Sequence, residues 1–331
     1  MPSRIDDPVI ADLSEGQVLR AILARTPQAD DAVIGPGDDA AVIAAPSGSV
    51  VATTDTLVHG PDFRLAWTDG FSLGWKSAAV NLADVAAMGA RPTALLVALA
   101  VPDDTRLSYI AAIADGLREA CAALAPGCAV VGGDLTVSDV LTVAVTALGD
   151  MEGRAPVLRS GARVGDQIVL GGRMGSSARG LAILFDRFRD ADGRPVPVDA
   201  AELDARDLAD VEAQLRPAPP IGLGAVAAQA GATAMMDVSD GLRLDAGRMA
   251  DASEVTIDLR SAALGDDPQS ALAGGEDHAL LAAFPRGAAL PDGFIRIGEA
   301  IERTVQSVLC DGEPVADSGW DPYRDWDAET G

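Results

Sequence analysis

Several residue types on which many enzymes depend are scarce or absent in this sequence. There are two His, three Cys and a single Lys, Lys76, and the sequence has neither a GxxxxGK(S/T) phosphate-binding loop nor a GxSxG nucleophile motif. Zinc sites built on His and Cys, P-loop nucleotide binding and Ser–His–Asp catalysis therefore have few or no residues to draw on. The glycine-rich segment GLGAVA at residues 222–227 follows PAPP rather than a strand pattern. We interpret it as the start of a helix and not as a dinucleotide-binding fingerprint.

Aromatic side chains and long apolar runs are also rare. Aromatics make up 4% of the chain against 48% hydrophobic residues, so the core must consist of Ala, Val, Leu and Ile. That composition is typical of an α/β (α+β) protein with tightly packed helices on sheets. The longest apolar run, residues 93–102, has the length of a strand, and the N-terminus lacks the apolar core of a signal peptide. Three Cys without CxxC spacing fit reduced thiols, so we expect a cytoplasmic protein.

Positive charge is the third shortage. The chain carries 50 acidic and 25 basic residues, a net charge of −25. This balance argues against nucleic acid or an anionic membrane as partner. If the protein binds phosphates, metal cations must supply much of the neutralising charge.

The chain is long enough for two domains. Residues 49–58 and 93–102 have strand patterns, and residues 69–89 form an Ala-rich helix pattern that ends at Gly89. The pattern of predicted helices and strands changes after about residue 151, from α/β to α+β. We therefore predict an N-terminal domain of residues 1–153 and a C-terminal domain of residues 154–331.

Acidic residues recur beside glycines and small residues, several of them where an apolar run ends. The segments are GDDAAV with Asp38 and Asp39, TTDT with Thr53, Thr54 and Asp55, NLADVAAMG with Asn81 and Asp84, GGDLT with Asp134, and DVSDG with Asp237, Ser239 and Asp240. If strand ends at one sheet edge gather these carboxylates, they repel each other unless cations lie between them. Mg²⁺ prefers such oxygen ligands and also holds nucleotide phosphates. These residues therefore favour a Mg²⁺-dependent, phosphate-handling enzyme.

Ordinary structural roles compete with this interpretation. A single Asp beside Gly usually marks a turn or a helix cap. We expect Asp69 to be such a cap, and Asp240 has the position to cap the helix that begins near Gly241. A non-catalytic, acidic metal-binding protein also remains as an alternative.

With these motifs in view, the chain resembles the thiamine-monophosphate kinase family of the aminoimidazole-ribonucleotide-synthetase-like superfamily. The likeness runs in order through GDDAAV, TTDTLV, KSAAVNLADVAAMGARP, GGDLT, RSGARVGD, LRPAPP, DVSDGL, GGEDHAL and GWDPY. It implies an N-terminal domain that forms a homodimer through its sheet, with flanking helices, and an α/β C-terminal domain. It further implies ATP-dependent, Mg²⁺-dependent conversion of thiamine monophosphate to thiamine diphosphate, with ATP bound near the dimer interface.

The resemblance also implies roles for individual residues, taken over motif by motif. The implied metal ligands are Asp38, Asp39, Thr53, Thr54, Asp55, Asp84, Asp134, Asp237 and Asp240, and the central catalytic acids among them are Asp84, Asp55 and Asp237. The implied ATP contacts are Gly133, Asp134, Arg159 and Ser239, and the implied thiamine phosphate contacts are Asp62, Glu276 and Trp320.

Two departures weaken the substrate assignments. The family usually shows GEDYEL, whereas this chain has GEDHAL, and Asp62 stands where a His is common. Related enzymes remain as rivals. Selenophosphate synthetases and the hydrogenase-maturation dehydratase rely on a Cys that this chain does not place correctly. Aminoimidazole-ribonucleotide synthetase is disfavoured by GGED and GWDPY.

Overall fold

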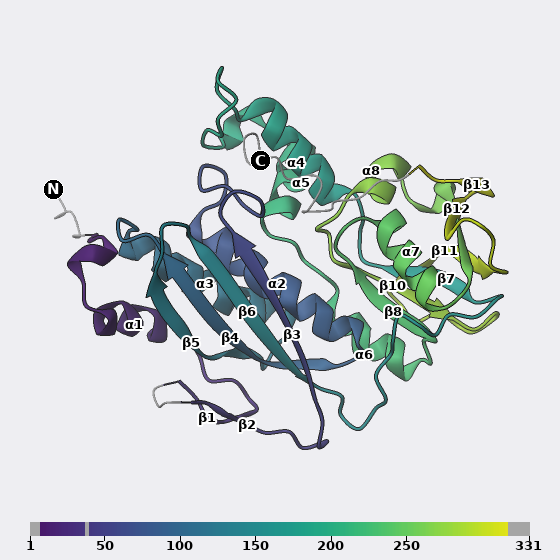
Figure 1. Cartoon of the computed structure of the whole chain (residues 1–331), viewed down its shortest axis with the longest axis horizontal. Helices are drawn as coiled ribbons and strands as arrows, with labels where there is room; N and C mark the ends of the chain where they lie inside the picture. The colour runs from purple at the N-terminus through teal and green to yellow at the C-terminus, as the bar shows by residue number, and fades with distance from the viewer. Residues whose placement is uncertain (1–6, 37–39, 317–331) are drawn as a thin grey trace.

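The computed structural model describes residues 7–36 and 40–316 and contains two main β-sheets with a long helix between them (Figure 1). The first sheet has four strands in the order β3 (Val50–Val58), β6 (Thr142–Asp150), β4 (Arg91–Val101) and β5 (Ala129–Val137). Only β4 and β5 pair in parallel. The predicted mixed α/β class is confirmed.

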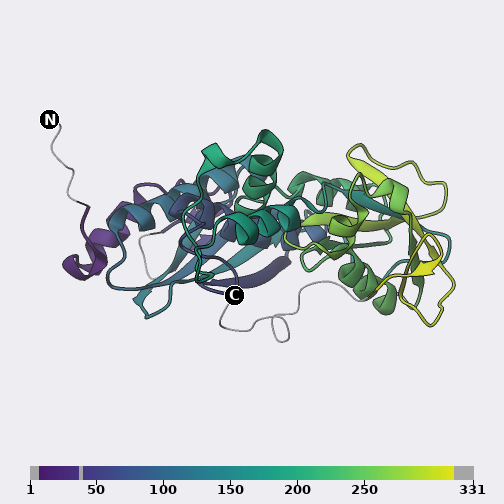
Figure 2. The same ribbon diagram turned by 90° about the horizontal axis from the view of Figure 1, so that it is seen from above.

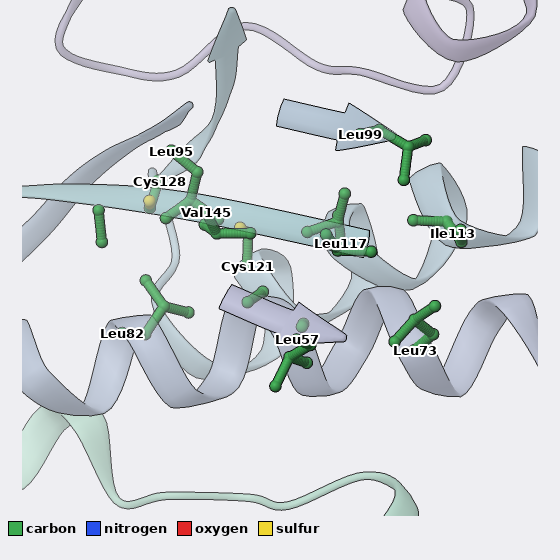
Figure 3. Close-up of a cluster of buried hydrophobic side chains, with 14 of the residues drawn as sticks. Leu57, Leu73, Leu82, Leu95, Leu99, Ile113, Leu117, Cys121, Cys128 and Val145 are labelled. Atoms are coloured by element: carbon green, nitrogen blue, oxygen red, sulfur yellow. The ribbon is translucent and has the colours of Figure 1, made fainter. Parts of the chain in front are cut away.

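Helices α2 (Gly70–Ala87) and α3 (Leu107–Leu124) cover one face of this sheet. They approach closely because glycines replace side chains where they cross. A Cβ at Gly74 would collide with the Ile113 carbonyl, and one at Gly116 with that of Phe71. The core between helices and sheet consists mainly of Ala, Leu, Val and Ile side chains, as the composition predicts, including Leu82, Leu95 and Val145 (Figure 3).

The predicted helix over residues 69–89 is confirmed as α2. The Asp69 carboxylate accepts a hydrogen bond from Ser72 N at 2.7 Å, which confirms its predicted role as a cap. Gly89 has a φ of 78°, a left-handed conformation that ends the helix at little cost only for glycine.

The second sheet has seven strands, buried centrally on both faces. Their order is β13 (Glu313–Pro314), β12 (Val308–Cys310), β9 (Thr256–Leu259), β11 (Phe294–Ile301), β7 (Gln167–Gly171), β10 (Ala279–Phe284) and β8 (Ala234–Val238). Helix α7 (Leu242–Ala252) packs on one face beside α8 (Pro268–Ala273), and α6 (Ile221–Gln229) packs on the other. All six residues of β10 are buried.

The two halves of the molecule, one around each main sheet, lie side by side along the long axis of the molecule (Figure 2). Two sets of contacts join them. Helix α6 packs against α2, whose C-terminal half also contacts β8. A hairpin of α4 (Ser176–Arg187) and α5 (Ala205–Leu215) buries Leu184 and Phe188 against Trp67 of the first half. The predicted division after residue 153 falls between β6 and β7, in a connection from 151 to 166, and it remains a prediction.

The other elements lie at the periphery. They are α1 (Glu15–Leu23), the β1 (Ala32–Ile34) and β2 (Val42–Ile43) pair, and the 3-10 turns η1 (Ile10–Asp12), η2 (Ala200–Glu202) and η3 (Ser261–Ala263). Within the described part of the chain, no helix is both long and apolar enough to cross a membrane.

Candidate active site

Helix α2 and strand β3 hold two acidic side chains next to each other. Thr53 Oγ1 donates a 2.7 Å hydrogen bond to Asp84 Oδ2, and Asp55 N donates to Asn81 Oδ1 at 3.0 Å. Asn81 and Asp84 are three residues apart and so share a face of the helix. Thr53 and Asp55 alternate with exposed residues on β3 and therefore face α2.

Strand β8 brings a third carboxylate to this place from the second half. Asp237 occupies the penultimate position of β8, and its Oδ2 lies 3.1 Å from His278 Nδ1. Beyond the strand, Ser239 N and Asp240 N donate to Asp245 Oδ2 at 3.1 and 3.0 Å. Asp245 is fully buried in α7, and these two hydrogen bonds therefore tie the DVSDG turn to that helix.

The electrostatics show that these carboxylates form one group. Burial, together with the charges of Asp237 and Asp55, raises the pKa of Asp84 to about 7, although the hydrogen bond from Thr53 acts to lower it. Burial also raises the pKa of Asp55, with Asp237 and Asp240 adding to it. Carboxylates that disfavour each other's ionisation form a site that a hard cation would stabilise.

A second polar cluster lies on the same helix, nearer its N-terminus. The buried Lys76 Nζ is 2.9 Å from Glu276 Oε1, and Gln214 of α5 donates to Glu276 Oε2. Asp62 Oδ2 accepts from Val58 N at 2.7 Å. Burial raises the pKa of Asp62, which Lys76 lowers and Glu276 raises, so these three charged groups are neighbours.

The GGEDH loop before β10 carries backbone strain. Glu276 and His278 have φ values of 63° and 51°, in the left-handed region that favours glycine. Hydrogen bonds hold them there: Glu276 N donates to Ser239 O at 2.7 Å and His278 N to Val238 O at 3.1 Å. Asp277 accepts from the α4 N-terminus, from Gly175 N at 2.6 Å and Ser177 N at 3.0 Å. Such strain clusters at functional sites.

Gly275 permits this loop to lie against the DVSDG turn, since a Cβ there would collide with the Ser239 carbonyl. We expect Gly275→Ala to destabilise the protein by roughly 2 kcal/mol, as overpacking against rigid backbone does. Thermal unfolding measures the change. The matched control is Gly222→Ala in α6, where a Cβ meets nothing within 4 Å and helix propensity favours Ala. Equal melting temperatures for the two variants would contradict the close approach.

The structure places some of the predicted residues elsewhere. Asp134 and Gly133 are exposed on β5, at the opposite edge of the sheet from β3. The register row runs Thr56, Ala144, Ala98, Asp134, so Asp134 is three strands, roughly 14 Å, from β3. It also belongs to the row that alternates with the Asp55 row, on the face that α2 does not cover. Within one chain Asp134 is therefore remote from Asp84.

Other predicted residues also stand apart or cannot be described. Thr54 Oγ1 donates to Val145 O at 3.0 Å and lies on the uncovered face. Arg159 is exposed in the connection between the halves, where its carbonyl accepts from Ser253. Asp240 does not cap α7, as the sequence alternative held, because its carboxylate pairs with Arg248 at 2.6 Å. Asp38, Asp39 and Trp320 lie outside the described residues.

Sequence reasoning gave no role to Lys76, Gln214 or Asp245. The signal for Lys76 was present, because the chain's only Lys stands within an apolar helix pattern. Gln214 and Asp245 gave no such signal. A cavity of about 590 Å³ lies elsewhere, lined by residues 154–158, Ser160 and the C-terminal end of α6, and its lining includes none of the candidate site residues.

Among residues 7–36 and 40–316, no three His, Cys, Asp or Glu side chains are arranged to hold a metal ion. Asp84 and Asp237 instead hydrogen-bond to Thr53 and His278. The donor set nevertheless fits a hard cation. It consists of carboxylate oxygens with a hydroxyl beside them, and burial together with mutual repulsion already opposes ionisation of Asp84.

Comparisons with known proteins identify the family of the chain. Residues 37–151 match the family model "AIR synthase related protein, N-terminal domain". A thiamine-monophosphate kinase from Mycobacterium tuberculosis is 39% identical over 97% of this chain and 93% of its own length. One from Corynebacterium glutamicum is 38% identical over 95% of each chain.

Solved structures match over most of their length as well. The structure of AaThiL complexed with AMPPCP and TMP has a TM-score of 0.72 at 29% identity, covering 93% of this chain and 97% of that one. Thiamine-monophosphate kinase from Stenotrophomonas maltophilia has a TM-score of 0.74 at 32% identity, covering 91% and 98%. The hydrogenase maturation protein HypE of E. coli, at 18% identity and a TM-score of 0.67, shares the fold, covering 93% and 97%.

Proposed function

The chain belongs to the thiamine-monophosphate kinase family, and from that premise we propose how its residues perform the family's reaction. The activity is the ATP-dependent phosphorylation of thiamine monophosphate, which yields thiamine diphosphate and ADP. The observation that carries the proposal is the cluster of three carboxylates, which come from both halves of the molecule: Asp84, Asp55 and Asp237.

The phosphoryl transfer does not need a strong general base from the protein. The acceptor is a phosphate monoester, whose second pKa of about 6 leaves an oxygen ionised at pH 7. That oxygen attacks the γ-phosphorus of ATP, a bond forms between them, and the bond from the γ-phosphorus to the β–γ bridging oxygen breaks, releasing ADP. A site without a free catalytic His or Lys fits this reaction.

The difficulty is electrostatic, since one anion attacks another. We propose that Asp55, Asp84 and Asp237 hold Mg²⁺, together with Thr53, Asp240 and the GDD residues Asp38 and Asp39. Bound Mg²⁺ supplies charge neutralisation for both phosphates. Ser239 is proposed to contact ATP, as are Arg159, Gly133 and Asp134. Asp62, Glu276 and Trp320 are proposed to contact the thiamine part.

We also propose a homodimer that forms through the face of the first sheet that α2 does not cover, part of which the β1–β2 segment overlies. Exposed apolar residues on this half of the molecule support it, among them Leu96, Val50, Val137, Val33 and Val42. Asp134 and Thr54 lie on the same face. In such a dimer, Asp134 and Thr54 would lie at the interface. There they would contribute either to the partner's active site or to an active site that both subunits share. We place this dimer in the cytoplasm, where ATP is available and the thiols of Cys121, Cys128 and Cys310 stay reduced.

The test of function is formation of thiamine diphosphate from thiamine monophosphate and ATP, separated chromatographically. We expect turnover with Mg²⁺ and a loss of about a hundredfold or more when EDTA removes it, because the phosphate charges are then unbalanced. Added Mg²⁺ should restore the rate. Turnover that EDTA leaves unchanged would refute the metal role, and no product under any condition would refute the function.

A further inference from the structure

Lys76 is the only lysine of the chain and is buried in the middle of α2, with 3% of its surface exposed. A buried ammonium group is costly unless it is paired and hydrogen-bonded. Its partner is Glu276 Oε1 at 2.9 Å. The ion pair therefore links α2 of the first half to the strained loop of the second.

Glu276 is held from several directions but is not enclosed. Lys76 and Gln214 each take one carboxylate oxygen, and the backbone N–H donates to Ser239 O. Even so, 35% of the Glu276 side chain is exposed. Its φ of 63° aims the side chain in a direction that a relaxed backbone would not give. The carboxylate is thus held in a fixed position on a side chain that stays partly exposed.

Asp62 completes a cluster with one positive and two negative charges. It comes from the loop after β3, and both Lys76 and Glu276 act on it electrostatically. With all three groups ionised, the cluster has a net charge of −1. That charge complements a ring carrying one positive charge, such as the thiazolium of thiamine monophosphate.

We propose that Lys76 is a positioning residue of the acceptor site, which fixes the Glu276 carboxylate beside Asp62 for the cationic ring of thiamine monophosphate. The inference rests on the proposed function and adds a residue to it. Along α2, Lys76 and Asp84 are eight residues apart, about 12 Å. The helix therefore separates a ring end, at Lys76, from a phosphate end, at Asp84.

Lys76→Met keeps the apolar stem and removes the ammonium group. We expect the KM for thiamine monophosphate to rise about tenfold or more, since Glu276 loses a charge-assisted hydrogen bond. The KM for ATP and kcat should stay within about twofold, because the contact serves acceptor binding only. Lys76→Arg, which keeps the charge, should recover part of the loss.

Arg25→Met is the matched control, since it removes an ion pair of 3.1 Å with Asp115 that joins α1 to α3 away from the site. Its kinetic constants should equal those of the wild type. The dissociation constant for thiamine monophosphate, measured by calorimetry without ATP, should follow the KM for each variant. A merely structural Lys76 would change the melting temperature and leave this constant unaltered.

Lys76→Met leaves the Glu276 carboxylate without its cation, a loss that also acts on folding. The double variant Lys76→Met/Glu276→Gln, which buries no lone charge, therefore provides a second measurement. If Lys76 acts through Glu276, the double variant should bind thiamine monophosphate as weakly as Glu276→Gln alone. A full additional loss in the double variant would overturn the proposal, as would a folded Lys76→Met with normal KM. A wild type without thiamine monophosphate-dependent turnover would overturn the proposed function and this inference together.

Discussion

Asp84→Asn is expected to lower turnover by about a thousandfold or more while the protein without bound metal becomes more stable. The variant keeps an oxygen that can accept the Thr53 hydrogen bond, so the local structure should persist. It loses the negative charge proposed to hold Mg²⁺ between the two phosphates. Electrostatic stabilisation of this kind is often the largest single contribution to catalysis, which sets the expected size.

The gain in stability follows from the pKa of Asp84, which burial and the neighbouring carboxylates raise from 3.8 to about 7. The folded state holds this proton more tightly than the unfolded state does. The wild type therefore loses stability as the pH rises from about 4 to about 7. The Asn variant lacks this loss and should be more stable at pH 8 by up to a few kcal/mol.

Thermal unfolding at pH 4 and pH 8, with and without Mg²⁺, measures both effects. Mg²⁺ should raise the melting temperature of the wild type and have much less effect on Asp84→Asn. Asp115→Asn, which removes a partly exposed carboxylate of α3, is the control and should change neither property. Near-normal turnover by Asp84→Asn would refute its role.

Leu96→Glu is expected to convert the proposed dimer into monomers. Leu96 is 36% exposed on the uncovered face of the first sheet, opposite Thr146 of β6, which hydrogen-bonds Thr54 of β3 at 3.2 Å. A carboxylate placed in the middle of a sheet-to-sheet interface would be buried without a partner. We expect the dimer dissociation constant to rise by about a hundredfold or more. Sedimentation equilibrium measures it, with Val305→Glu in an exposed turn as the control.

The same experiment tests the position of Asp134. If Asp134 serves the partner's site, Leu96→Glu should lose activity together with the dimer. Mixed subunits give a sharper result. Asp84→Asn and Asp134→Asn should each be inactive alone. Random mixing should restore about a quarter of the wild-type activity, because half of the dimers then carry one intact site. With both variants inactive alone, no recovery on mixing would place Asp134 in its own subunit's site.

The elements themselves were largely predictable because their signals are local. Helix α2 was recognised from its Ala-rich pattern, its cap at Asp69 and its stop at Gly89. Strands β3 and β4 of the first sheet were recognised from the strand patterns of residues 49–58 and 93–102. The prediction of how the carboxylates come together was less accurate. Carboxylates at strand ends were expected to meet at a sheet edge, but Asp55 lies inside β3, Asp84 lies on a helix and only Asp237 is near a strand end.

The sequence by itself determined which residues are available: with 50 acidic against 25 basic residues, a chain that binds phosphates must leave much of the charge neutralisation to metal cations. It also determined the family, because ordered motifs survive in the sequence. Only the tertiary structure decided which acids are neighbours. It joined Asp84 to Asp237, separated Asp134 from both, and paired Lys76 with Glu276 across 200 residues of chain. The reason is physical: propensity and capping act over a few residues, whereas these contacts depend on how α2 packs between two sheets.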